Sequence, residues 1–236
     1  MASRFSQQFS HRHVILPVIH VVDLAQAERN ARIAYDAGAD GVFLINHDIS
    51  SQALLAVYAE LTAVFPHWWL GVNCLDLDAA ATFAAVPPGM AGVWVDNAGI
   101  DETRTDQPAA ERVRQAQQQH GWTGLYFGGV AFKYQREVAD LEWAAQTAVS
   151  WMDVITTSGP GTGHAASVAK IRTMKQAIGS HPLAIASGIT PENVGDYLPH
   201  ADCFLVATGI SHRFDQFDPA RVQALVQRIR AGIQKP

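Results

Sequence analysis

The sequence is poor in charged residues and in cysteine. Asp, Glu, Lys and Arg make up 17% of its 236 residues, below the usual share of about 25%, so we expect another copy to cover part of the surface in a homo-oligomer. Seventeen basic and 22 acidic residues give a net charge of -5, which disfavours nucleic acid or an anionic membrane as a partner. The two cysteines, Cys74 and Cys203, lie far apart in predicted buried strands. They indicate core thiols in a reducing compartment rather than a disulfide or a metal site.

Long apolar runs and a signal-peptide pattern are missing as well. No apolar run reaches the roughly 18 residues of a membrane span, and residues 1–12 contain no apolar core of signal-peptide length. We therefore expect a cytoplasmic protein without a membrane partner. Residues 1–12 are polar and predict a flexible arm. Residues 13–236 predict one domain, because no linker or low-complexity segment divides them.

Short apolar runs alternate with helical patterns through the rest of the chain. The runs that predict strands are residues 14–20, 41–46, 69–74, 91–96, 124–130, 152–157, 183–187 and 203–207. Each is followed by a helical pattern, the last over residues 219–233. This alternation predicts an α/β fold, a single (β/α)8 TIM barrel, for which about 250 residues are typical. The alternative is an open doubly wound sheet, but His20–Asp23 after the first strand lacks the glycine-rich dinucleotide fingerprint.

The segment 182–211 predicts an anion site. Its two strands end in Gly188 and Gly209, and the helix-start pattern Thr190–Glu192 after the first directs backbone N–H groups to the strand end. Two such turns late in a barrel are typical of the phosphate site after strands 7 and 8. The phosphate-binding candidates are Ser187, Gly188, Thr208 and Gly209, with Gly161 and Gly163 of the preceding glycine-rich loop. The alternative is that these glycines only end strands; Gly188→Val is expected to abolish anion binding while the barrel still folds.

Polar residues gather where the predicted strands end, which in a TIM barrel is the end that carries the chemistry. The candidate catalytic residues are Asp96, Lys133, His20 and Asn73, and the further pocket candidates are Asn46, Asp48 and Thr157. A carboxylate directly after the apolar run Val93–Val95 needs a partner, a metal or water. Several of the other candidates could instead be structural. His20 could be a hydrogen-bonded core histidine, Asn46 and Asn73 could hold loops in place, and Asp48 could be a helix N-cap. Lys133 could extend outward over a helix.

These residue types suit isomerase- or lyase-type chemistry on a small phosphorylated metabolite. A carboxylate can move a proton, and a lysine can stabilise an enolate electrostatically or form a Schiff base. We expect no cofactor and no resident metal, with a divalent ion between Asp48 and Asp96 as the alternative. The loop 159–163 lacks the Gly-Lys-Ser/Thr ending of a P-loop, so nucleotide hydrolysis gains no support.

Several segments resemble the BtpA family of TIM-barrel proteins, which is named for a member linked to photosystem I biogenesis. The similar segments are residues 15–20, 40–48, 70–75, 130–133, 156–163, 187–194 and 218–222. The resemblance implies a barrel with a phosphate-type site and fixes no reaction, and a non-catalytic ligand-binding or assembly role is the alternative to an enzyme. The chain departs from the family in the short loop Val21–Leu24 and in the turn Thr208–His212, which lacks the expected lysine. These departures allow a smaller substrate or a different role.

Overall fold

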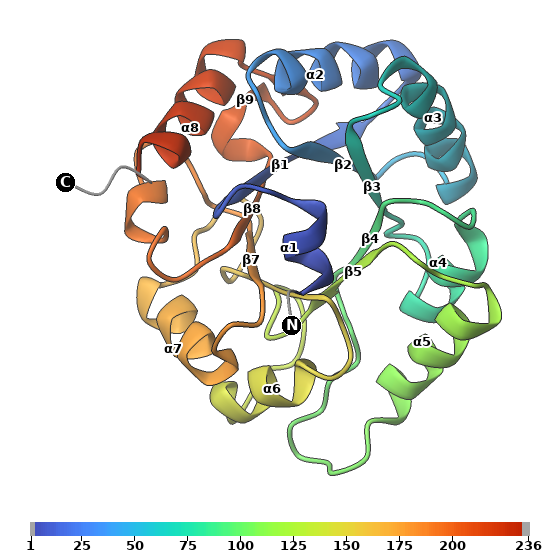
Figure 1. Ribbon diagram of the computed structural model, residues 1–236, viewed down its shortest axis with the longest axis vertical. Coiled ribbons are helices and arrows are strands. Elements are labelled where there is room, and N and C mark those ends of the chain that lie inside the picture. Colours follow the sequence, from blue (N-terminus) through green and yellow to red (C-terminus); the bar gives the residue numbers. More distant parts are fainter. Residues whose placement is uncertain (1–2, 233–236) are drawn as a thin grey trace.

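The computed structural model describes residues 3–232, and its eight main strands close into a parallel barrel in chain order (Figure 1). The strands are β1 (Val14–Val21), β2 (Gly41–Asn46), β3 (Trp69–Asn73), β4 (Gly92–Val95), β5 (Leu125–Gly129), β6 (Val154–Ser158), β7 (Leu183–Ala186) and β8 (Cys203–Val206). Because β1 pairs with both β2 and β8, the sheet has no open edge. The predicted TIM barrel is confirmed and the open sheet is excluded.

Helices surround the barrel and connect its strands (Figure 1). They are α2 (Leu24–Asp36), α3 (Ser51–Val64), α4 (Ala79–Ala85), α5 (Pro108–Gln119), α6 (Leu141–Ala148), α7 (Val168–Ile178) and α8 (Pro219–Ala231). The short helix expected after β7 is a single 3-10 turn, η1 (Val194–Asp196). Residue 233, the expected end of the last helix, lies outside the described residues. None of the helices within residues 3–232 has the length and apolar character needed to cross a bilayer.

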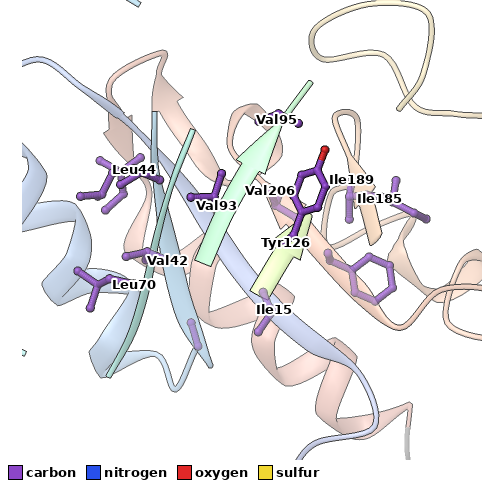
Figure 2. Packing of buried hydrophobic residues seen from close by; sticks show 14 of the residues in the cluster. Ile15, Val42, Leu44, Leu70, Val93, Val95, Tyr126, Ile185, Ile189 and Val206 are labelled. Atoms are coloured by element: carbon purple, nitrogen blue, oxygen red, sulfur yellow. The ribbon is translucent and has the colours of Figure 1, made fainter. Parts of the chain in front are cut away.

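Side chains along each strand alternate between the inside of the barrel and the helix-covered outside. The inside is filled by aromatic rings: the Phe43 ring lies 5.0 Å from that of Trp69, 5.7 Å from Trp94 and 5.1 Å from Phe127, centroid to centroid. A Cβ atom at Gly92 would overlap the Trp69 ring, so glycine at this strand position leaves room for the ring. Most outside positions are aliphatic, with Tyr126 as an aromatic exception, and they pack beneath the helices (Figure 2).

Helix α1 (Arg4–Gln8) closes the N-terminal end of the barrel and lies across the middle of the ring in Figure 1. Its Phe5 ring packs 6.4 Å from Phe127, and Phe9, which follows the helix, packs 5.5 Å from Trp69. Both phenylalanines are buried. The flexible arm expected over residues 1–12 is therefore wrong for the described part of that segment, because two aromatic side chains four residues apart anchor it to the core; residues 1–2 lie outside the described part.

The carboxyl ends of parallel strands in a closed barrel all meet at one end. The polar residues Asn46, Asn73, Asp96, Thr157, Ser187 and Thr208 lie at or next to these strand ends and therefore share one end of the barrel, as predicted. The two cysteines are buried and unpaired, as expected for core thiols. Burial raises the pKa of Cys74 to about 12 and that of Cys203 well above its usual value, so both thiols stay protonated.

Candidate functional site

A cavity of about 200 Å³ opens at the carboxyl end of the barrel. Its floor is apolar and consists of inward-facing residues such as Val18, Trp94 and Leu205. Of the predicted site residues, His20, Asp96, Lys133, Gly163, Ser187 and Thr208 line the cavity. Side chains from distant parts of the sequence thus meet above one apolar floor, which is the usual construction of a small-molecule site.

Asp96 is positioned by Asn73. The Asn73 side-chain amide donates a hydrogen bond of 2.9 Å to Oδ1 of Asp96, and Asn73 itself is buried. Burial raises the pKa of Asp96, against the opposing effects of this hydrogen bond and of the nearby charge on Lys133. A carboxyl group with a raised pKa is better suited to exchange protons near neutral pH than an exposed aspartate. Asn73 is therefore a positioning residue for the carboxylate.

Lys133 points into the cavity rather than outward over a helix. Its Nζ atom lies 3.4 Å from the Ser187 hydroxyl and 3.4 Å from the Thr162 hydroxyl. The ion pairs found among residues 3–232 do not include one between Lys133 and Asp96, although the lysine charge acts on the carboxyl group. The ammonium group therefore lies beside the hydroxyl groups of Ser187 and Thr162 and within electrostatic reach of Asp96.

The turn that carries Lys133 is fixed by a second lysine. Ala131 and Tyr134 have left-handed backbone conformations, with φ of 49° and 61°, which are unfavourable for residues with a side chain. Lys170 donates hydrogen bonds to the carbonyl groups of Ala131 (2.6 Å) and Ser158 (2.7 Å), and burial lowers the pKa of Lys170 to about 8. The backbone N–H of Lys133 is held by the Ser158 hydroxyl at 2.8 Å. These contacts offset the strain and hold the turn in place.

His20 is held in one tautomer by the segment after β8. That segment contains η2 (Thr208–Ile210) and a hairpin of β9 (Ser211–Arg213) and β10 (Gln216–Phe217). The Nδ1–H group of His20 donates to the Phe214 carbonyl at 3.0 Å, so Nε2 carries the free lone pair. Burial, together with the charges on His47 and Lys133, lowers the pKa of His20 to about 4. His20 is thus hydrogen-bonded, as expected of a core histidine, and is also part of the cavity wall.

The glycines of the predicted phosphate site pack against neighbouring backbone. Gly188 has a φ of 70°, and a Cβ atom there would overlap the backbone of Ala165. A Cβ atom on Gly209 would overlap the carbonyl group of Ile189. A valine at this position would collide with main-chain atoms, so Gly188→Val is expected to disturb the turn as well as anion binding and does not separate the two. Gly188, Gly209 and Gly161 lie beside the cavity but not among the residues that line it.

Asn46, Thr157 and Asp48 are not brought to the cavity. Asn46 donates to the Ile49 carbonyl and to the Asp76 carboxylate, at 2.9 and 2.7 Å, and so ties two loops together. Thr157 donates to the Ala131 carbonyl at 3.2 Å. Both positions point outward, because the next residue along each strand is the one that faces the barrel axis. Asp48 is exposed and is not the N-cap of α3, which is Ser50.

Three polar residues of the cavity wall were missing from the sequence-based set: His47, Tyr134 and Thr162. His47 follows Phe43 and Ile45 at a spacing of two residues and therefore faces the barrel axis as they do, which the sequence alone could have indicated. Tyr134 and Thr162 lie in turns, and the Tyr134 hydroxyl is 3.4 Å from that of Thr162. No group of three or more His, Cys, Asp or Glu residues within the described range could hold a metal ion.

Comparison with known proteins identifies the family and the fold. The model of the BtpA family matches residues 10–231, and no curated protein matches the chain. The phosphoribosyl anthranilate isomerase of Thermus thermophilus is 15% identical over 92% of this chain and 98% of its own, with a TM-score of 0.60. The geranylgeranylglyceryl phosphate synthase of Thermoplasma acidophilum, solved with its substrate sn-glycerol-1-phosphate, is 14% identical over 98% of this chain and 100% of its own, with a TM-score of 0.69. At these identities the two structures show a shared barrel fold.

Proposed function

The chain belongs to the BtpA family, and we propose that it is an enzyme acting on a small phosphorylated metabolite, with isomerase- or lyase-type chemistry at the mouth of its barrel. The observation that carries this proposal is that Asp96, Lys133 and His20 line one cavity. A carboxyl group with a raised pKa, a cation and a neutral imidazole form a set that can move a proton and stabilise the charge that results. Scattered side chains would instead have favoured a non-catalytic role.

The roles follow from the surroundings of each group. Asp96, held by Asn73, takes a proton from the carbon next to a carbonyl group and returns it to the adjacent position, so that no net proton is consumed. The Lys133 ammonium faces the oxygen of the enolate and stabilises its negative charge. The neutral His20 accepts a hydrogen bond at Nε2 from a substrate hydroxyl, because its Nδ1–H is already engaged with Phe214.

The phosphate group is assigned to the other side of Lys133. Ser187 and Thr208 provide hydroxyl groups there, and Gly163, with a φ of 77°, exposes its backbone in the same wall. Turns with accessible N–H groups bind phosphate without a strongly basic pocket, which agrees with the net charge of -5. The synthase of Thermoplasma acidophilum, a similar barrel, is solved with a phosphorylated substrate, and this supports a phosphorylated substrate here.

The proposal is tested first with a metabolite library in a thermal-shift screen. A ligand present at about 100 times its dissociation constant adds about 2.7 kcal/mol to the free energy of unfolding, which gives a clear rise in melting temperature. Phosphorylated compounds with a carbonyl group are expected among the hits. Borohydride trapping of a hit on Lys133 would then indicate a Schiff base, and its absence would indicate electrostatic stabilisation by the lysine.

The hits then provide the assay for two variants. Asp96→Asn and Lys133→Met keep the approximate size of each side chain and remove its charge, so both are expected to fold with near-native melting temperatures. Each should lower turnover or affinity by at least about tenfold, roughly 1.4 kcal/mol. Asp48→Asn is the matched control, because Asp48 is exposed and outside the cavity. Wild-type behaviour of both site variants would instead support the non-catalytic ligand-binding or assembly role.

A further inference from the structure

A second cavity adjoins the barrel mouth, between the loops that follow β3 and β4. Its volume is about 360 Å³, against about 200 Å³ for the mouth. Leu75 and Asp96 line both cavities, so the two adjoin at Asp96, the residue proposed to move the proton. Small-molecule sites commonly measure about 300–1,000 Å³, a range that the second cavity reaches and the mouth alone does not.

The second cavity, here called the side pocket, has apolar walls and one cation. Leu77 and Ala80 from the α4 side and Val113 from α5 face it, and Arg112 of α5 lines it as well. Within residues 3–232, the Arg112 guanidinium makes no hydrogen bond, ion pair or ring contact. Arg114, two residues later, shows the contrast: it donates to the Ser150 carbonyl at 2.8 Å and lies 3.9 Å over the Trp151 ring.

Two carboxylates also line the side pocket, and both already have partners. Asp78 accepts a hydrogen bond of 2.8 Å from the Ala81 N–H as the N-cap of α4. Asp96 accepts its hydrogen bond from Asn73, which also lines the pocket. Arg112 is exposed and is thus the charged group of this wall that no other residue of the range 3–232 pairs with. A guanidinium group has donors in a fixed planar fork that fits a carboxylate with two parallel hydrogen bonds.

We propose that the side pocket binds the non-phosphorylated end of the substrate, an apolar segment that ends in a carboxylate paired with Arg112. This inference rests on the proposed function, because the phosphate group would lie across Asp96 in the mouth. The substrate class that follows is a phosphorylated carboxylic acid whose reacting carbon lies over Asp96 and whose two anionic ends bind in separate cavities.

The pocket is tested with phenylacetate and phenylacetamide, which share their shape and differ in charge. Ligand titrations followed by NMR should show that phenylacetate binds the wild type and that Arg112→Gln weakens its binding by at least about tenfold. Phenylacetamide should bind more weakly and equally to both proteins. Arg172→Gln is the matched control, since Arg172 is an exposed arginine of α7 away from the pocket. Ala80→Phe fills the pocket and should remove the binding of both probes.

Several results would overturn the inference: no binding of phenylacetate to the wild type, equal binding of acid and amide, or unchanged affinity in Arg112→Gln or in Ala80→Phe. The outcome is separable from that of the proposed function, because the probes carry no phosphate. Lys133→Met should leave phenylacetate binding unchanged. If phosphorylated metabolites fail to bind while phenylacetate binds through Arg112, the side pocket stands and the proposed substrate class falls.

Discussion

His20 shows how the surroundings of one residue set its chemistry. An imidazole in water has a pKa near 6.5 and is partly charged at neutral pH, whereas burial lowers the pKa of His20 to about 4. The Phe214 carbonyl fixes the proton on Nδ1. Nε2 is therefore an unprotonated acceptor throughout the physiological range, and the positive charge of the cavity comes from Lys133.

The lowered pKa of His20 predicts a loss of stability in acid. The unfolded state binds a proton at His20 near pH 6.5, and the folded state binds it only near about pH 4. The stability that the neutral His20 contributes is therefore fully present above the unfolded pKa and is lost as the pH falls towards 4. Between about pH 7 and about pH 5 it amounts to about 2 kcal/mol. Urea unfolding of the wild type and of His20→Gln, which cannot titrate, should differ in their pH dependence by this amount. Parallel curves for the two proteins would contradict the neutral, buried state.

Part of the site could be predicted at the residue scale, because side chains alternate along a strand. His20, Asn73 and Asp96 share the inward parity of Val18, Gly71 and Trp94 on their strands. The same parity separates Asn46 and Thr157 from the site, so the period of two could have excluded them. The position of Lys133 could not be derived in this way, because it depends on left-handed turn residues that the sequence does not mark.

At the scale of elements, the hairpin of β9 and β10 packs against His20, a residue of the cavity wall. Gln26 and Asn30, both buried on α2, donate to the Asp215 carbonyl at 2.6 and 2.9 Å. Asn30 also accepts from the Phe217 N–H at 3.1 Å. The Phe214 ring, at the tip, lies 3.9 Å from the His20 ring. The hairpin was missed in the sequence because two short strands without apolar alternation give no signal, and its partners are nearly two hundred residues away in the chain.

Asn30→Ala tests whether α2 positions the hairpin over His20. The change removes two buried hydrogen bonds and leaves the Asp215 carbonyl with Gln26 alone, so the free energy of unfolding should fall by about 1–3 kcal/mol. If the hairpin then loosens, His20 becomes more hydrated and its pKa, measured by NMR titration, should rise from about 4 towards its ordinary value. A loss of stability with an unchanged His20 pKa would show that Asn30 supports the fold without positioning the site.

At the scale of the whole molecule, the barrel was predictable because parallel strands require helical crossovers, and strand patterns alternate with helix patterns throughout the chain. The homo-oligomer expectation, drawn from the small share of charged residues, remains a proposal, and the tryptophans of the chain differ in what exposed surface they offer for it. Trp143 is 49% exposed, whereas Trp69 is 5% exposed and already belongs to the core. The helix that closes the bottom of the barrel was missed, since two phenylalanines in a polar segment are a weak signal until the rings they contact are known.

That N-terminal helix should stabilise the barrel without taking part in its chemistry. Phe9 is 7% exposed and packs on Trp69, at the end of the barrel opposite the cavity. Phe9→Ala should lower the free energy of unfolding by about 3 kcal/mol, because it leaves a hole next to the interior rings. Phe214→Ala is the same change at the other end, where the ring is 50% exposed, and it should cost less stability while altering the His20 pKa. Urea unfolding measures the loss of stability in each variant, and NMR titration measures the His20 pKa in each. Equal losses of stability in Phe9→Ala and Phe214→Ala would contradict this division between the closed bottom of the barrel and the cavity at its mouth.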